Sequence, residues 1–157
     1  MCCYHSLTAT ILDMGQTYRL RVKNKPDLLF AMMRALADDT ARIAFEGRLA
    51  GTELFSMAGA SHDETVVLRR NTIQPRLDFV VFPLTPASVS QLETAIRSKV
   101  AFNGQNGIVH VQIEKDGVVA FAAYDQFDDE CVVVAAVRVE LLDELVSNRV
   151  LHSYVAS

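Results

Sequence analysis

The chain has 157 residues, of which half are hydrophobic and 22% are charged. This composition is typical of a globular protein with a substantial core, so we expect one domain over residues 1–157. The net charge of −4 disfavours duplex DNA as a partner, because binding phosphates requires a cationic surface. No run of about 18 apolar residues occurs, so we expect no membrane span. The N-terminus lacks secretory features and the three cysteines suit no disulfide framework, which predicts a cytoplasmic location.

Local patterns predict the elements of the first half. Alternating apolar and polar residues indicate strands over about 5–13 and 18–22, and Pro26 is suited to begin a helix over about 26–38. Four further strands are expected. They lie near 41–49, 52–58, 65–71 and 76–83. Thr85 and Pro86 are typical of the N-cap and first residue of a second helix, about 86–100.

The second half begins with a strand in which Val109, Val111 and Ile113 share one face. Asp116-Gly117 is the strongest hairpin signal in the chain and leads into a strand over 118–124. The apolar run 131–139 predicts a buried central strand, and a last helix is expected over about 140–149. Short turns between strands favour antiparallel pairing. We therefore predict an α+β fold, a mostly antiparallel sheet with helices packed on one face.

The order of elements also indicates an internal repeat. Residues 43–68 aligned without a gap on 109–134 give six identities in 26 positions, including Gly51 with Gly117 and Phe55 with Phe121. The sequence therefore predicts a tandem duplication of a ββαββ-like unit. The halves would span about 5–60 and 65–125, followed by a C-terminal strand and helix over 131–151. Whether the halves form one sheet or two is left open.

The first predicted helix is apolar on nearly all sides. Where the second helix has Ser90, Glu93 and Arg97, the first has Phe30, Met33 and Ala37. Such a helix is either covered on both sides or binds something. Three explanations stay open: cover by the C-terminal helix or the N-terminal hairpin, a contact with a second copy or another protein, and an apolar ligand.

Cationic side chains recur at every second residue between the first strand and the first helix. They are Arg19, Arg21, Lys23 and Lys25. On an extended strand all four would project from one face. Charge of this kind protects an exposed edge strand against aggregation, and it equally suits an anionic partner.

Catalytic signals are weak. The candidates are His110, Glu114, Asp125 and Cys131, which the predicted hairpins could bring together. The chain contains no phosphate-binding loop, no dinucleotide-binding glycine motif and no nucleophile-elbow motif. The four histidines show no metal-ligand spacing, so we expect no metal and no cofactor.

These observations favour a non-catalytic cytoplasmic binding protein, such as an inhibitor, an immunity-type protein or an adaptor. Its contacts would be the apolar helix face at Phe30, Met33 and Ala37 and the basic strand, and it would bind a protein partner or self-associate as a homodimer. The alternative hypothesis is a small hydrolase or isomerase with its site at the seam between the two halves.

Overall fold

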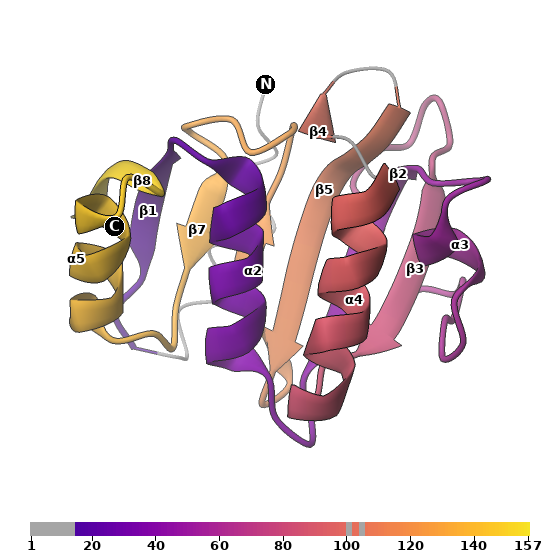
Figure 1. The fold of residues 1–157 in the computed structure, drawn as a ribbon, viewed down its shortest axis with the longest axis horizontal. Coiled ribbons are helices and arrows are strands. Elements are labelled where there is room, and N and C mark those ends of the chain that lie inside the picture. Colours follow the sequence, from indigo (N-terminus) through magenta and orange to yellow (C-terminus); the bar gives the residue numbers. More distant parts are fainter. Residues whose placement is uncertain (1–14, 100–101, 104–105) are drawn as a thin grey trace.

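The computed structural model describes residues 15–99, 102–103 and 106–157. The strand predicted over 5–13 lies outside these residues. Within them, seven strands form one antiparallel sheet in the order β3-β2-β5-β6-β7-β1-β8, and the short β4 pairs with β5 (Figure 1). The strands are β1 (Tyr18–Val22), β2 (Arg42–Arg48), β3 (Asp78–Pro83), β4 (Phe102–Asn103), β5 (Asn106–Lys115), β6 (Val118–Ala123), β7 (Val132–Val134) and β8 (Leu151–Ala156).

Four helices complete the described fold. They are α2 (Lys25–Leu36), α3 (Glu53–Ser56), α4 (Pro86–Lys99) and α5 (Val139–Ser147). In Figure 1, α2, α4 and α5 lie on the same face of the sheet, with α2 in the middle. Pro26 lies in the first turn of α2, as predicted, and Asn24 caps this helix by accepting a hydrogen bond from the Asp27 N–H at 3.1 Å. The α+β fold is therefore confirmed, with one sheet rather than two.

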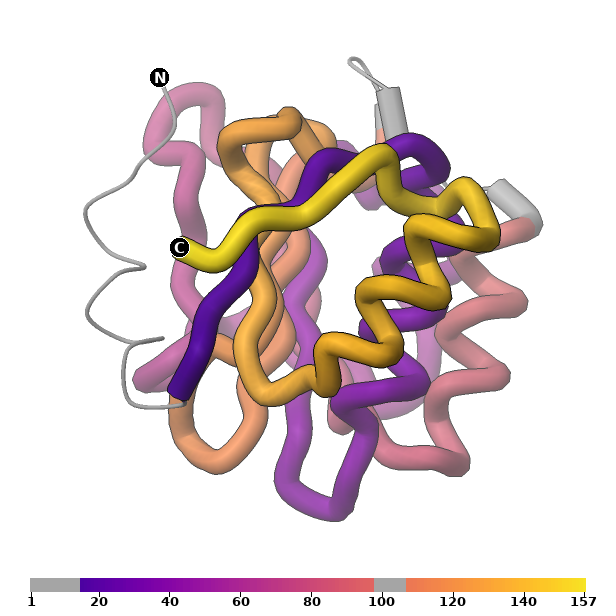
Figure 2. Tube along the Cα trace, turned by 90° about the vertical axis from the view of Figure 1, so that its left-hand side faces the viewer, coloured from indigo at the N-terminus to yellow at the C-terminus, as the bar shows by residue number. Residues whose placement is uncertain are grey.

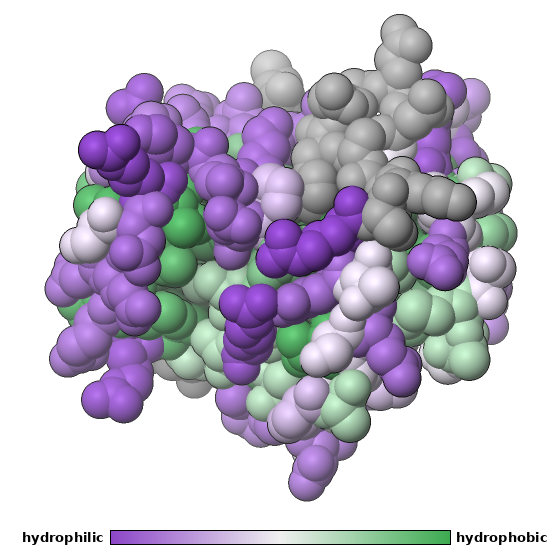
Figure 3. All heavy atoms as spheres, viewed as in Figure 1, coloured by the Kyte–Doolittle hydropathy of each residue, from purple (hydrophilic) through white to green (hydrophobic). Residues whose placement is uncertain are grey.

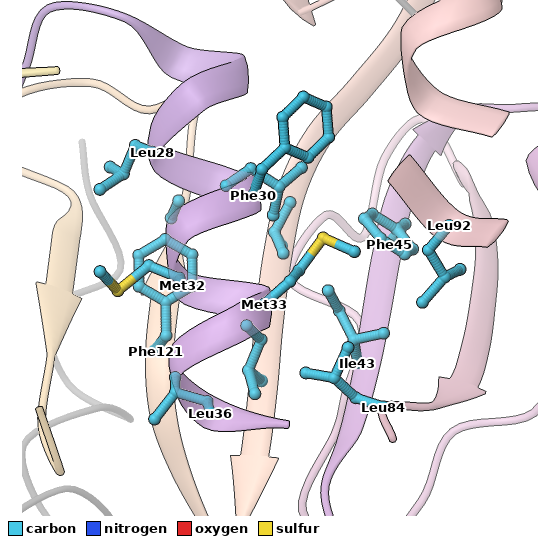
Figure 4. Close-up of a cluster of buried hydrophobic side chains, with 14 of the residues drawn as sticks. Leu28, Phe30, Met32, Met33, Leu36, Ile43, Phe45, Leu84, Leu92 and Phe121 are labelled. Carbon is cyan, nitrogen blue, oxygen red and sulfur yellow. The ribbon is translucent and has the colours of Figure 1, made fainter. Parts of the chain in front are cut away.

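The middle position of α2 explains why this helix is apolar on nearly all sides. Phe30 is 1% exposed and Met33 is fully buried. Figure 4 shows Met33 directed toward Ile43 and Phe45 of β2, near Leu92 of α4, whereas Met32 points to the opposite side of α2. Burying one such side chain contributes about 1.5–3 kcal/mol. In the space-filling view of this face, strongly hydrophobic residues show only in patches between hydrophilic ones (Figure 3).

A long irregular stretch lies on the opposite face of the sheet. We call residues 60–77 the covering segment. Its Leu68 is fully buried in a small cluster with Ala44, Phe79 and Val81, outside the main core between sheet and helices. The strand expected over 65–71 is absent, because backbone groups here bond to side chains instead of to a neighbouring strand. The strand expected over 52–58 is replaced by α3.

The predicted duplication is not shown. Gly51 and Gly117 both have positive φ, at 85° and 80°, and both follow a strand. Beyond these turns the two windows differ, because Gly51 precedes the helix α3 and Gly117 precedes the strand β6. Residues 57–68 and 124–134 differ as well, since only the second stretch contributes a strand to the sheet.

The C-terminal strand β8 was not predicted. Arg149, with φ 63°, forms the turn after α5, and the chain then returns along β1. This pairing makes β1 an interior strand between β7 and β8, so the edge-strand explanation for its charges is wrong. The strand also ends at Val22, so Lys23 follows it and Lys25 begins α2. Only Arg19 and Arg21 therefore share a strand face as predicted.

Candidate functional site

The buried polar side chains gather beneath the covering segment. Among the described residues, the buried polar or charged ones are Glu46, His110, Gln112 and Glu114. Glu46 lies on β2, and the other three alternate along β5, so their side chains share one face. The strand register places Glu46 opposite His110 and Arg42 opposite Glu114. A set of charged groups in this position needs partners, because desolvating an unpaired polar group costs several kcal/mol.

Two of these side chains bind the backbone of the covering segment. The Glu46 carboxylate accepts hydrogen bonds from the N–H groups of Asn71, at 2.8 Å, and Thr72, at 3.2 Å. The Gln112 amide donates to the Arg69 carbonyl at 2.8 Å and accepts from the Arg69 N–H at 3.4 Å. These bonds replace the strand pairing that the sequence predicts for this stretch. They fix residues 69–72 against the sheet.

The imidazole of His110 links the covering segment to a second loop. Its Nδ1 accepts a hydrogen bond from the Asp125 N–H at 3.1 Å, so in the neutral ring Nε2 carries the proton. Nε2 lies 2.7 Å from Thr72 Oγ1 and donates to it. Burial lowers the pKa of His110, and this effect exceeds the opposing attraction from Glu46 and Asp125. The lowered pKa agrees with a neutral ring.

The loop that contacts His110 has unusual backbone geometry. Asp125, Gln126 and Phe127 all have positive φ, at 50°, 60° and 65°. Such conformations cost about 1–3 kcal/mol each for residues other than glycine. The loop is held by the Asp125 bond to His110 and by a 2.8 Å hydrogen bond from Gln126 N–H to the Val109 carbonyl. His110 therefore helps to hold a strained turn.

Cys131 lies near this loop but carries no free thiol. It is disulfide-bonded, so its sulfur has no proton to donate and the 3.8 Å separation from Asp125 Oδ2 is a contact rather than a hydrogen bond. Cys131 could act as a nucleophile only as a thiolate, and a disulfide-bonded sulfur cannot form one. The disulfide also departs from the expectation that the cysteines form no bridge.

Glu114 is separate from the other three catalytic candidates. Its side chain is 5% exposed, and Oε2 lies 3.5 Å from an Arg42 nitrogen. Among the described residues, nothing donates a hydrogen bond to Glu114 Oε1, which is buried. Glu114 and Arg42 border an open hollow of about 700 Å3 with residues 64–67, Arg69 and Gly117. The sequence candidates thus divide into His110, Asp125 and Cys131 in one place and Glu114 in another.

The arrangement around His110 does not suit nucleophilic catalysis. A hydroxyl nucleophile needs a histidine nitrogen that accepts its proton, with a carboxylate at the other nitrogen. Here Nε2 donates to Thr72 Oγ1, and Nδ1 accepts from a backbone N–H. The Glu46 oxygens bind the covering segment instead of the ring. The hydrogen bonds of these groups are made within the chain, as in a polar network that stabilises a fold.

The residues that the sequence predicts as partner contacts on the helix face do not form an exposed surface. Phe30 and Met33 are buried, and Ala37 is half-buried just beyond the end of α2. The Arg97 guanidinium of α4 lies 4.2 Å from the centre of the Phe30 ring. In this structure one side of α2 is covered within the chain, but by α4 and not by the C-terminal helix α5 that the sequence prediction named.

The cationic residues are more accessible. Arg21 and Lys23 are exposed, whereas Arg19 and Lys25 are half-buried. The Arg21 Nε lies 3.2 Å from Asp129 Oδ2, and both side chains are about half exposed or more, at 64% and 49%. An exposed pair of this kind contributes at most about 1 kcal/mol. Arg21 thus already has an acidic neighbour within the chain.

The sequence does not predict one feature of the covering segment. Val66 is 94% exposed and Ile73 is 91% exposed, which are the largest values among the exposed large hydrophobic residues of the described chain. They flank the fixed residues 69–72. The pattern around Val66 predicts a strand, so the exposure of these two side chains could not be anticipated.

Neither a metal centre nor a membrane span is found in the part of the chain that the structure describes. No group of three or more His, Cys, Asp or Glu side chains there is arranged to hold a metal ion. No helix there is long and apolar enough to cross a bilayer. Comparison of the chain with known protein families, with curated proteins and with solved structures finds no match.

Proposed function

We propose that this chain is a non-catalytic interaction protein that docks on a protein partner through the covering segment. The observation that carries this proposal is the near-complete exposure of Val66 and Ile73 on a segment whose backbone is fixed to the sheet. Irregular stretches of this length within compact domains are usually functional. The inhibitor, immunity-type and adaptor classes all fit an interaction of this kind.

The fixed backbone makes these two side chains suitable anchors. An ordered segment loses little conformational freedom on binding, so more of the contact energy appears as affinity. Burying the two side chains in a partner would contribute about 1.5–3 kcal/mol each. Arg69 lies between them in sequence and is 64% exposed, and arginine is enriched at interfaces. Exposed Arg21 and Lys23 are a second proposed contact, for an acidic partner surface.

The proposed location stays the cytoplasm, and one observation weighs against it. Disulfides persist mainly in oxidising compartments, and Cys131 is disulfide-bonded. Counting free thiols by mass spectrometry after alkylation, in protein purified from its native host, tests this point. One or more bridged cysteines in that protein would reject the reducing compartment.

The alternative function is a small hydrolase or isomerase. The proximity of His110 and Asp125 favours it, but both ring nitrogens already bind groups of the chain. A substrate would have to displace Thr72 or Asp125 before the ring could exchange a proton with it. We therefore rank this function second.

The test compares wild type with the double variant Val66→Asp, Ile73→Asp. Both positions are exposed, so we expect an unchanged fold and the loss of one specific partner from crosslinked complexes of the native host, quantified by mass spectrometry. The matched control is Ala87→Asp, Ser90→Asp, which adds the same charge at two exposed positions of α4. Equal recovery of every partner by both double variants would reject the proposal.

A further inference from the structure

Within residues 15–99, 102–103 and 106–157, no strand pairs with the outer side of β8, the last strand of the sheet. The Ser157 N–H donates to the Thr17 carbonyl at 3.0 Å, and the register pairs Tyr18 with Ala156 and Leu20 with Tyr154. Bonded and non-bonded pairs alternate in an antiparallel ladder. The main-chain N–H and C=O groups of Tyr154 and Ala156 therefore point away from β1. Figure 2 looks onto this side of the molecule, where β8 lies in front.

The opposite edge of the same sheet is protected. Ser61 exchanges two backbone hydrogen bonds with Val81 of β3, at 2.9 and 2.7 Å, and His62 Nδ1 lies 3.3 Å from the Phe79 carbonyl. The strand β3 also ends in Pro83. In contrast, β8 contains no proline, lysine, aspartate or glutamate, and these are the residues that commonly block edge pairing. The two edges of one sheet thus differ in whether another strand can join.

The charge around β8 differs between the two faces of the sheet. Tyr154 lies on the helix side, where its hydroxyl donates to Asp143 Oδ1 of α5. That hydrogen bond raises the pKa of Tyr154, and Glu140 adds to the effect, so two acidic side chains of α5 lie close to this edge. Val155 lies on the other side and is 56% exposed. The helix side is acidic, and the other side carries Val155 together with Arg19 and Arg21 of the neighbouring β1.

We propose that the free edge of β8 binds an extended segment of a partner protein. In this segment, cationic side chains facing α5 alternate with β-branched apolar side chains beside Val155. The main-chain groups of Tyr154 and Ala156 supply the hydrogen bonds, as in other cases of strand addition. A second copy of this chain fits less well, because β8 has no lysine or arginine and two-fold pairing would place two acidic α5 helices side by side.

The first test uses the full chain, labelled with 15N, and the blocked peptide Thr-Lys-Val-Lys-Val-Lys-Thr. We expect amide shifts centred on Tyr154 and Ala156, and weaker binding as ionic strength rises. A peptide of the same composition with its lysines adjacent, and one with glutamate in place of lysine, serve as controls. Each lost charge pair should weaken binding about two- to fivefold. Equal binding by all three peptides would overturn the proposal.

Two variants make the test specific to the edge. Ala156→Pro removes an N–H that points outward, so the bonds to β1 remain and peptide binding should be lost. Ala156→Thr keeps the N–H and should bind like wild type. Circular dichroism checks that both variants fold, and Glu140→Lys should weaken binding even if Ala156→Pro does not fold. Binding by a folded Ala156→Pro variant equal to that of wild type would contradict the proposal.

Self-association is the remaining outcome. A concentration-dependent doubling of mass without peptide, with shifts at the same two amides, would show that a second copy occupies the edge and would overturn the partner assignment. The proposal does not rest on the covering segment. The variant Val66→Asp, Ile73→Asp should therefore bind the lysine peptide like wild type, which separates the two proposals.

Discussion

The Nδ1 atom of His110 accepts a hydrogen bond from the main-chain N–H of Asp125 at 3.1 Å, so this ring holds the strained turn only while Nδ1 carries no proton. Protonation would place two N–H groups against each other. The charged and polar groups that face the ring are Glu46 from β2, Thr72 from the covering segment and Asp125 with Tyr124 from the end of β6.

The first prediction follows from the lowered pKa of His110. A histidine whose folded-state pKa lies below the unfolded value of about 6.5 binds protons more tightly in the unfolded chain. Its contribution to stability is complete above that value and is lost as the pH falls toward the folded-state pKa. Urea unfolding should therefore show a larger loss of stability between about pH 7.5 and about pH 5.5 for wild type than for His110→Gln.

The glutamine variant is the appropriate control because its amide oxygen can accept the Asp125 N–H but does not titrate in this range. The two proteins differ only at position 110, so the difference between their losses of stability reports on this side chain. Identical losses in the two proteins would mean that His110 does not couple pH to folding.

The second prediction concerns the attachment of the covering segment. In Glu46→Gln, an amide NH2 replaces one carboxylate oxygen, so one of the N–H groups of Asn71 and Thr72 loses its acceptor. We expect a loss of about 1–3 kcal/mol in stability. Hydrogen exchange at these two amides should become at least roughly tenfold faster. Glu53→Gln, at an exposed position of α3, should leave both quantities unchanged.

The parts of the fold that could be predicted are those set by neighbouring residues. Pro26 and Pro86 lie at the starts of α2 and α4, and Asp116-Gly117 forms the turn between β5 and β6. Each of these signals acts within a few residues, through a fixed φ or a tolerated positive φ. The predicted bounds of both long helices agree with the structure to within two residues.

The parts that could not be predicted depend on distant residues. Residues 65–71 have the composition of a strand, but Gln112 and Glu46 provide the hydrogen bonds that a neighbouring strand would otherwise supply. The buried state of His110 depends likewise on Thr72 and Asp125. Alternation in the sequence does not distinguish a side chain under the covering segment from one in solvent. The sequence therefore singled out His110 and Asp125, but it predicted neither the roles of Glu46, Gln112 and Thr72 nor the arrangement of these groups.

The third prediction tests whether α2 offers a contact surface. Met33 is fully buried beside Ile43 and Phe45, so Met33→Glu would bury a carboxylate without a partner. We expect a loss of more than about 4 kcal/mol in stability. Met33→Leu should cost less than about 1.5 kcal/mol. A folded, stable Met33→Glu protein with an altered mass in light scattering would instead support the contact surface that the sequence predicts.

The fourth prediction concerns the bulge between β2 and β5. The register shifts between Glu46 and Gly47, and there the backbone of Gly107 comes so close that a Cβ atom on Gly47 would lie 2.0 Å from its carbonyl oxygen. Backbone cannot move aside as a flexible side chain can, so Gly47→Ala should displace β5 from β2. Because Glu46 is adjacent, the displacement also disturbs the attachment of the covering segment.

We expect Gly47→Ala to lower the free energy of unfolding by more than about 2 kcal/mol, measured by urea denaturation. Gly59→Ala is the matched control, since Gly59 has φ 89° but a Cβ atom added there would meet nothing within 4 Å beyond its chain neighbours. That variant should cost only the backbone penalty of about 1–2 kcal/mol. Amide exchange at Asn71 and Thr72 should accelerate in Gly47→Ala and not in Gly59→Ala. If the two variants behave alike, the close approach of Gly107 does not constrain the sheet.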